Sequence, residues 1–240
     1  MSLNIGRALQ EGIARTLSRA GLLLAVVWFV LGLLNQLAYN SAIAGVLPDV
    51  PNQPMATLGP TLPLSPTAAG AVVFVLYLGS FVVVAAALRT FVTEETDTIP
   101  TEHFTRNLVL MLVNLIVGGI VYGIAVAIGL VLLIIPGIFI AVSLFFWNVY
   151  VIVEDQNFVE SFQNSWALTS GNRLMLFVLG VVVVIVVAVV GGIFGVATAV
   201  LPGIVGLAFA QIGSAFTSVF AVATAARTYL QLTGAEAAAA

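Results

Sequence analysis

The chain alternates between long apolar stretches and short polar segments. Uncharged apolar runs of roughly 18 residues or more are typical of membrane-spanning helices, because each helix must cross the hydrocarbon core. The pattern therefore predicts an all-α fold, an integral membrane bundle of six transmembrane helices that forms a single domain over residues 1–240. The six predicted spans cover about residues 21–38, 69–88, 107–134, 138–153, 173–199 and 204–226.

The segment before the first span, residues 3–19, has a different pattern. Apolar residues recur at every fourth position and polar residues cover the opposite side, which predicts an N-terminal amphipathic helix. Such a helix could lie in the headgroup layer, or it could pack as a cytoplasmic cap on the bundle. The apolar stripe consists of Ile5, Leu9, Ile13 and Leu17.

Residues 157–169, between the fourth and fifth spans, predict a short helix on the cytoplasmic membrane surface. Asn157 is suited to cap its first turn, and Gly171 is suited to end it in a left-handed conformation. Three aromatic residues recur at every fourth position, so we expect them to point toward the membrane interior. These residues are Phe158, Phe162 and Trp166.

Two proline–glycine pairs interrupt apolar sequence, Pro136-Gly137 and Pro202-Gly203. Proline removes a helical hydrogen-bond donor and glycine permits a sharp reversal of the chain. Both pairs therefore predict tight turns, the first between spans three and four and the second between spans five and six. Because Gly129 lies within a span, we expect Gly137→Val to be the more damaging of the two valine substitutions.

Residues 39–67 are predicted to be one long loop that holds six of the nine prolines. Proline at every third position lies on one face of a polyproline II helix. No basic residue accompanies the prolines, so we interpret the loop as a stiff connector rather than a recognition segment. The two triplets are Pro48, Pro51, Pro54 and Pro60, Pro63, Pro66.

Charge is scarce and one-sided. Only 7% of the residues are charged, there is no cysteine, and all seven cations are arginines. Six alternating spans place every arginine on the side that also holds both termini, so the positive-inside rule predicts a multi-pass protein of the cell membrane with both termini cytoplasmic. The lack of lysine, the abundance of alanine and valine, and the excess of acidic residues resemble proteins of salt-loving archaea.

The cytoplasmic ends of the spans carry the candidate binding residues. Glu154 and Asp155 follow the fourth span, and Arg106, Arg173 and Arg227 are expected on the same side. A collar of salt bridges would hold the surface helix in place. The alternative is a contact site for phosphorylated lipid headgroups, because arginine binds phosphate in a bidentate manner.

Three motifs in the second half of the chain resemble one family. They are Pro136-Gly137-Ile138, Val153-Glu154-Asp155 and Ser165-Trp166-x-Leu168-Thr169-x-Gly171-Asn172. This set resembles the multi-pass membrane domain attached to some glycerophosphodiester phosphodiesterases, and related stand-alone membrane proteins. In the phosphodiesterases a separate soluble barrel performs catalysis. The resemblance therefore implies the membrane half alone, without enzyme activity.

The sequence offers little for catalysis. It contains no phosphate-binding loop, nucleophile elbow or HExxH motif. The one histidine, His103, follows Glu102 in a polar loop, where we expect it to be solvated. We therefore predict no catalytic residue, no metal and no cofactor.

The leading hypothesis is a non-enzymatic membrane protein that acts in lipid handling or membrane organisation. The alternative is a small oligomeric transporter or channel, which would require the amides of Asn114, Asn148 and Gln211 to converge on one cavity. A membrane-embedded enzyme ranks third, because the spans hold no acid–base groups. The expected partners are membrane lipids, further copies of the chain or other membrane proteins, and no nucleic acid.

Overall fold

The computed structural model describes residues 3–44, 59–93 and 96–234. Within these ranges every regular element is a helix, and six of the helical segments are long and apolar enough to cross a membrane. The predicted all-α fold is confirmed. The helices are α1 Ile5–Thr16, α2 Arg19–Ala44, α3 Pro66–Phe91, α4 Glu102–Thr105, α5 Leu108–Leu132, α6 Ile134–Ser143, α7 Trp147–Val153, α8 Phe158–Thr169, α9 Arg173–Val200 and α10 Gly203–Thr233.

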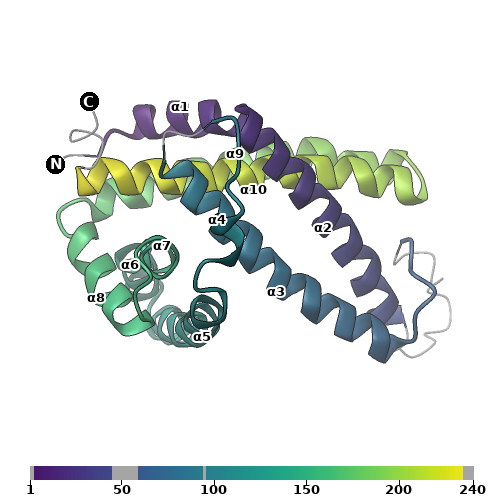
Figure 1. Ribbon diagram of the computed structural model, residues 1–240, viewed down its shortest axis with the longest axis horizontal. Helices are drawn as coiled ribbons and strands as arrows, with labels where there is room; N and C mark the ends of the chain where they lie inside the picture. Colours follow the sequence, from purple (N-terminus) through teal and green to yellow (C-terminus); the bar gives the residue numbers. More distant parts are fainter. Residues whose placement is uncertain (1–2, 45–58, 94–95, 235–240) are drawn as a thin grey trace.

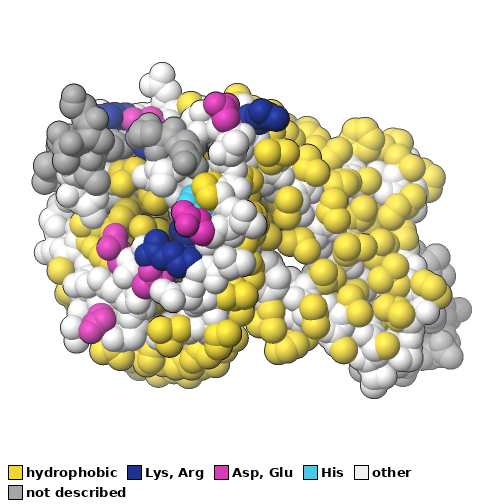
Figure 2. All heavy atoms as spheres, viewed as in Figure 1, with side chains coloured by type: hydrophobic (Ala, Val, Ile, Leu, Met, Phe, Trp, Pro, Cys, Tyr) yellow, Lys and Arg dark blue, Asp and Glu magenta, His cyan; other side chains and the backbone are white. Residues whose placement is uncertain are grey.

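The long helices pair into three hairpins, α2 with α3, α5 with α6, and α9 with α10. Figure 1 shows α5 and α6 end-on while α10 lies across the view and α2 and α3 run obliquely. The hairpins therefore diverge from one another instead of forming a parallel bundle. Apolar side chains cover the diverging half of the face in Figure 2, whereas charged side chains gather at the other half. This division is what a membrane-embedded region and its polar end require.

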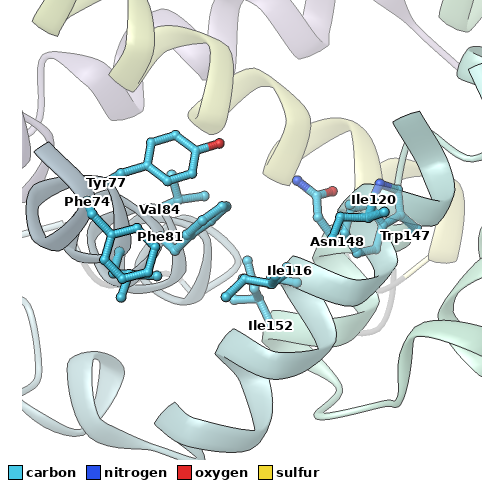
Figure 3. Close-up of a pocket in the computed structure, with 12 residues that line it drawn as sticks. Phe74, Tyr77, Phe81, Val84, Ile116, Ile120, Trp147, Asn148 and Ile152 are labelled. Atoms are coloured by element: carbon cyan, nitrogen blue, oxygen red, sulfur yellow. The ribbon is translucent and has the colours of Figure 1, made fainter. Parts of the chain in front are cut away.

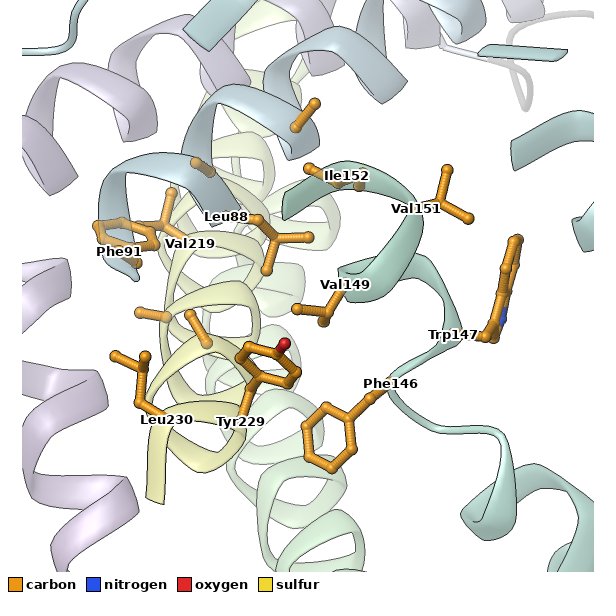
Figure 4. Packing of buried hydrophobic residues seen from close by; sticks show 14 of the residues in the cluster. Leu88, Phe91, Phe146, Trp147, Val149, Val151, Ile152, Val219, Tyr229 and Leu230 are labelled. Carbon is orange, nitrogen blue, oxygen red and sulfur yellow. The ribbon is translucent and has the colours of Figure 1, made fainter. Parts of the chain in front are cut away.

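A compact core holds the hairpins together near this polar end. Leu88 and Phe91 of α3, Val149 and Ile152 of α7, and Val219 of α10 are nearly or fully buried in it (Figure 4). The core thus joins one helix from each hairpin region, counting α7 as the continuation of α6. Away from the core the hairpins separate, which leaves space between them.

The two proline–glycine pairs have different conformations. At the second pair the chain reverses as expected, because Pro202 is extended and Gly203 has a φ of +61°. At the first pair the expectation is corrected: the chain reverses at Leu133, which is extended, and Pro136 and Gly137 lie in the first turn of α6. Proline is tolerated there because the first amides of a helix have no intrahelical acceptor.

Gly137 has a packing role instead of a turning role, which corrects the expectation that Gly137→Val is more damaging than Gly129→Val. A Cβ atom on Gly129 would lie 2.7 Å from the Cα atom of Gly137, and a Cβ atom on Gly137 would lie 2.6 Å from the amide nitrogen of Leu130. The two glycines therefore let the backbones of α5 and α6 touch. Such close approach through small residues is common between membrane helices.

The fourth span, predicted as continuous, is interrupted at residues 144–146 between α6 and α7. Backbone groups freed by a break inside a membrane need other partners. Ser165 of α8 supplies two: its Oγ accepts from the amide of Phe146 at 3.0 Å and donates to the carbonyl of Ser143 at 3.2 Å. Thr169 Oγ1 donates to the same carbonyl at 3.0 Å. Helix α8 is thus fastened to the break.

Helix α1 packs on α10, as the cap alternative proposed. Ala8 is fully buried, and a Cβ atom on Gly12 would lie 2.3 Å from Thr224 Oγ1, so the contact depends on small residues. Part of the predicted apolar stripe stays outside, with Ile13 51% and Leu17 61% exposed. That outer edge can still meet the headgroup layer.

The predicted loop at 39–67 is shorter than expected, because α2 continues to Ala44 and α3 begins at Pro66. Its described part is tied to α2: Asn40 Nδ2 donates to the carbonyl of Pro60 at 3.0 Å, and Ser41 Oγ accepts from the amide of Leu62 at 2.7 Å. The first proline triplet lies outside the described residues.

Candidate functional site

The polar end of the molecule is built around Arg89 at the end of α3, whose side chain is only 3% exposed. Its Nε donates to the carbonyl of Ile152 at 2.9 Å, and its Nη1 donates to the carbonyl of His103 at 2.9 Å. A buried guanidinium needs such partners, because an unpaired buried charge is strongly unfavourable. Arg89 therefore joins α3, α4 and α7. Arg89 directly follows the second predicted span, 69–88, and was not among the candidate binding residues predicted from the sequence.

Asp155 provides the counter-charge. It pairs with Arg106, whose side chain is 51% exposed, and lies 3.6 Å from Arg89. Asp155 also has a φ of +53°, a left-handed conformation that non-glycine residues seldom adopt. Two arginines and one aspartate leave this group with a net charge of +1. The exposed Arg106 is the member of this group that an anion could reach.

The other predicted collar residues lie in separate groups. Arg227 pairs with Glu11 of α1 at 2.8 Å. Glu154 accepts a hydrogen bond from the hydroxyl of Tyr229 at 3.2 Å. Arg173 donates to the carbonyl of Trp166 at 3.3 Å and stacks over aromatic rings. The structure therefore brings Arg106 and Asp155 together but does not join all five residues in one collar.

Glu11 links α1 to α10, and its environment in the fold shifts its pKa. Partial burial by itself would raise the pKa of Glu11, but hydrogen bonds from Arg227 and Arg7 outweigh it and hold the pKa below its ordinary value. The carboxylate is therefore charged at neutral pH. The contact of the N-terminal helix with the end of α10 depends on that charge.

His103 is engaged, contrary to the expectation that it is merely solvated. Its Nδ1 lies 3.0 Å from Thr90 Oγ1, and that hydroxyl donates to the carbonyl of Ala86 at 2.7 Å. Because the hydroxyl hydrogen is used there, the imidazole Nδ1 must be the donor to Thr90. This is a structural contact. Among the described residues, no group of three or more His, Cys, Asp or Glu side chains could hold a metal ion.

Helix α8 confirms its predicted caps. Asn157 Oδ1 accepts from the amides of Val159 and Glu160, both at 3.0 Å, and Gly171 has a φ of +85°. Of the aromatic stripe, Phe162 packs 5.4 Å from Trp147, measured between ring centroids.

The remaining aromatic positions pack against α5 and α6. Trp166 lies 5.5 Å from Phe139, although it remains 44% exposed. Phe158 lies beside Gly118, because a Cβ atom on that glycine would be 2.9 Å from the Cβ of Phe158. The most buried line of α8 is nevertheless the small polar one, Ser161, Ser165 and Thr169.

An apolar groove of about 560 Å³ separates α3 from α5 and α7. Figure 3 shows the α3 aromatic residues on one side and the α5 and α7 residues on the other. The Asn148 amide is the polar side chain on the α7 wall. Ile152 belongs to the groove and also to the Arg89 contact, so the groove ends beside the charged group. Its lining comprises Phe74, Tyr77, Leu78, Phe81, Val84, Leu115, Ile116, Gly119, Ile120, Trp147, Asn148 and Ile152.

The three amides considered for a transport cavity do not converge. Asn114 Oδ1 accepts from the amide of Phe158 at 3.0 Å, so Asn114 anchors α8. Asn148 lines the groove, and Gln211 lines a different cavity between α2, α3 and α10. That second cavity also holds Asn35 and Gln36, which sequence reasoning missed. The sequence could have indicated these two residues, because their adjacent amide side chains interrupt the apolar first span.

Three apolar hairpins, a charged end and an apolar groove together define a multi-pass helical membrane protein. Residues 3–232 match the family described as Domain of unknown function (DUF7847), and the chain belongs to this family. Searches of curated proteins and of solved structures found no match to the chain.

Proposed function

We propose that this protein is not an enzyme and that it binds a membrane phospholipid, for lipid handling or membrane organisation. The observation that carries the proposal is the apolar groove between α3 and α5, which ends beside the Arg89–Asp155–Arg106 group. One site thus combines an apolar groove with the net positive charge of the Arg89–Asp155–Arg106 group. A phospholipid has the matching pair of parts, an acyl chain and an anionic headgroup.

The groove suits an acyl chain in size and chemistry. Its volume of about 560 Å³ lies within the range of roughly 300–1,000 Å³ that ligand pockets occupy. Phe74 is 62% exposed and Ile120 is 58% exposed, so the groove is open toward the surrounding lipid. A chain could enter from the bilayer without crossing a polar barrier.

The charged end suits a phosphate. Arg106 is half exposed and belongs to a group with net positive charge, and arginine forms strong bidentate hydrogen bonds to phosphate. Arg106 also donates to the carbonyl of Val153, the residue after the groove residue Ile152. A headgroup at Arg106 would therefore lie next to the end of the groove.

We also propose that the protein lies in the cell membrane with its polar end on the cytoplasmic side. Four arginines make contacts at the polar end: Arg89, Arg106, Arg173 and Arg227. The positive-inside rule therefore supports a cytoplasmic location for that end and for both termini. The motifs that resemble the membrane domain of glycerophosphodiester phosphodiesterases support a lipid-related role in the cell membrane.

Trp147, which lines the groove, offers a direct test. In a Trp28→Phe, Trp166→Phe background, Trp147 is the sole tryptophan of the chain's three. Phosphatidylglycerol with brominated acyl chains, titrated into phosphatidylcholine nanodiscs, should quench it saturably. Gly119→Leu, which fills the groove, should raise the half-quenching lipid fraction about tenfold, as expected for a loss of about 1.4 kcal/mol of binding energy.

Gly123→Leu is the matched control, since it lies one turn further along α5 with open space around it. It should behave like the parent protein. Arg106→Gln should reduce the preference for phosphatidylglycerol over phosphatidylcholine. Quenching that rises linearly and equally in the parent, Gly119→Leu and Gly123→Leu proteins would rule out a specific lipid site in the groove.

A further inference from the structure

The second cavity, of about 270 Å³, is partly lined by polar side chains although it lies among membrane spans. It lies between α2, α3 and α10, and Asn35, Gln36, Ser80 and Gln211 contribute polar side chains to it. Polar groups within spans are costly in hydrocarbon and indicate a functional site when they face a cavity. The groove of the proposed function has a largely hydrophobic lining, so the two sites differ in chemistry.

Several polar groups in this cavity are available to a ligand. No hydrogen bond within the described residues engages the amide of Asn35 or that of Gln211. Gln36 donates one amide hydrogen to Asn40 at 2.9 Å, which leaves its carbonyl oxygen as an acceptor. Amide side chains offer both donors and acceptors. The cavity can therefore bind a head whose oxygens accept hydrogen bonds from these amides, and the amide oxygens can also accept from a head that carries a hydroxyl group.

Gly32 keeps the cavity open for Gln211. A Cβ atom on Gly32 would lie 2.6 Å from Gln211 Oε1, so any larger residue would displace the amide. Gly32, Gln36 and Asn40 follow one another at every fourth position, and Asn40 is bonded to the carbonyl of Pro60 beyond the end of α2. Gln36 and Asn40 thus extend the polar side of α2 from the cavity toward the end of the α2–α3 hairpin.

The lining of this cavity also specifies the charge of its ligand. No Arg, Asp or Glu belongs to it among the described residues, so a charged head would be left uncompensated in a low-dielectric site. Its volume of about 270 Å³ falls just below the lower limit of roughly 300 Å³ for whole-ligand pockets. The cavity is large enough for a headgroup, while an apolar tail would remain in the bilayer.

We propose that this cavity binds the uncharged, oxygen-bearing head of a membrane amphiphile through Asn35, Gln36 and Gln211. Two kinds of lipid share this chemistry. One is a glycerolipid with a free hydroxyl group, and the other is a quinone with a hydrocarbon tail. Trp28 also lines the cavity and provides an aromatic surface beside the head.

Trp28 fluorescence tests the proposal in the full chain. A Trp147→Phe, Trp166→Phe protein in phosphatidylcholine nanodiscs retains only Trp28 of the three tryptophans. Decylubiquinone, whose ring quenches tryptophan, should quench Trp28 saturably. Dioleoylglycerol should reverse the quenching if the glycerolipid head binds, whereas no reversal would assign the site to the quinone. Dioleoyl phosphatidic acid, which is charged, should not reverse it.

Gln211→Leu should weaken the apparent affinity about tenfold, and Asn35→Leu provides a second test should Gln211→Leu fail to fold. Gly119→Leu, which alters the other groove, should leave Trp28 quenching unchanged and thereby separates this proposal from the preceding one. Two results would overturn it: quenching that rises linearly and equally in the parent and Gln211→Leu proteins, or reversal by phosphatidic acid as effective as reversal by dioleoylglycerol.

Discussion

Replacing Arg89 by methionine tests the strongest polar contact of the fold. Methionine keeps much of the side-chain volume but removes the charge and all donors. The carbonyls of Ile152 and His103 would each lose a hydrogen bond of 2.9 Å, and Asp155 would lose its buried partner at 3.6 Å. Arg89 thus connects three segments that are distant in the sequence, so its loss should loosen the polar end as a whole.

The magnitude follows from these contacts. Leaving a buried acceptor unsatisfied costs about 1–3 kcal/mol, and there are two such carbonyls. Breaking a buried ion pair by removing one partner costs about 3–5 kcal/mol, but Asp155 retains Arg106. Because Asp155 stays paired, we take the two carbonyls as the main loss and expect Arg89→Met to lower the free energy of unfolding by about 2–6 kcal/mol.

The assay is a titration with sodium dodecyl sulfate in mixed micelles, followed by tryptophan fluorescence. Arg7→Met is the matched control, because Arg7 is 56% exposed and pairs with Glu11 one turn along the same helix. Such surface pairs contribute about 0–1 kcal/mol. If Arg89→Met and Arg7→Met lowered the free energy of unfolding equally, the assigned role of the buried guanidinium would be refuted.

Gly129→Val and Gly137→Val should destabilise the protein to a similar degree in thermal unfolding, because each Cβ atom would approach backbone atoms within 2.8 Å; a mild Gly129→Val variant would contradict the α5–α6 contact. Ser165→Ala should cost about 1–3 kcal/mol of unfolding free energy by detergent titration, since it leaves the buried amide of Phe146 without an acceptor, while Thr169 still donates to the carbonyl of Ser143. Ser161→Ala should cost much less, because the equally buried Ser161 hydroxyl has no hydrogen-bond partner among the described residues; equal losses would argue against the assigned bonds. Because folding lowers the pKa of Glu11, its stabilising contribution is complete above the ordinary value of 4.5 and is lost as pH falls through the lowered value. The melting temperature of the parent should therefore fall more steeply on acidification than that of Glu11→Gln, and parallel pH profiles would exclude this linkage.

Local features were predictable because neighbouring residues decide them. The six spans follow from uninterrupted apolar runs, since a membrane helix satisfies its backbone hydrogen bonds within itself. The ends of α8 follow from the residues at those ends: Asn157 accepts from amides of the first turn, and Gly171 adopts a positive φ. The same locality explains the turn at Pro202-Gly203.

The candidate sites were less predictable, because their parts come from distant segments. Arg106 and Asp155 could be proposed as partners from span topology alone. Arg89 could not, because only the packed structure places it against Ile152, which lies 63 residues further along the chain. Asn35 and Gln211 belong to different helices, so their shared cavity depends on how α2 and α10 pack.

The sequence by itself determined the helices, their membrane character and the gathering of charge at one end. These properties depend on composition and on spacing within one helix. Only the tertiary structure decided that Pro136 lies inside a helix, that the fourth span is broken, and that the hairpins diverge to leave a groove and a polar cavity. The physical reason is that packing between helices, through the Gly129–Gly137 approach and the Ser165 hydrogen bonds, selects among conformations that local sequence preferences leave open.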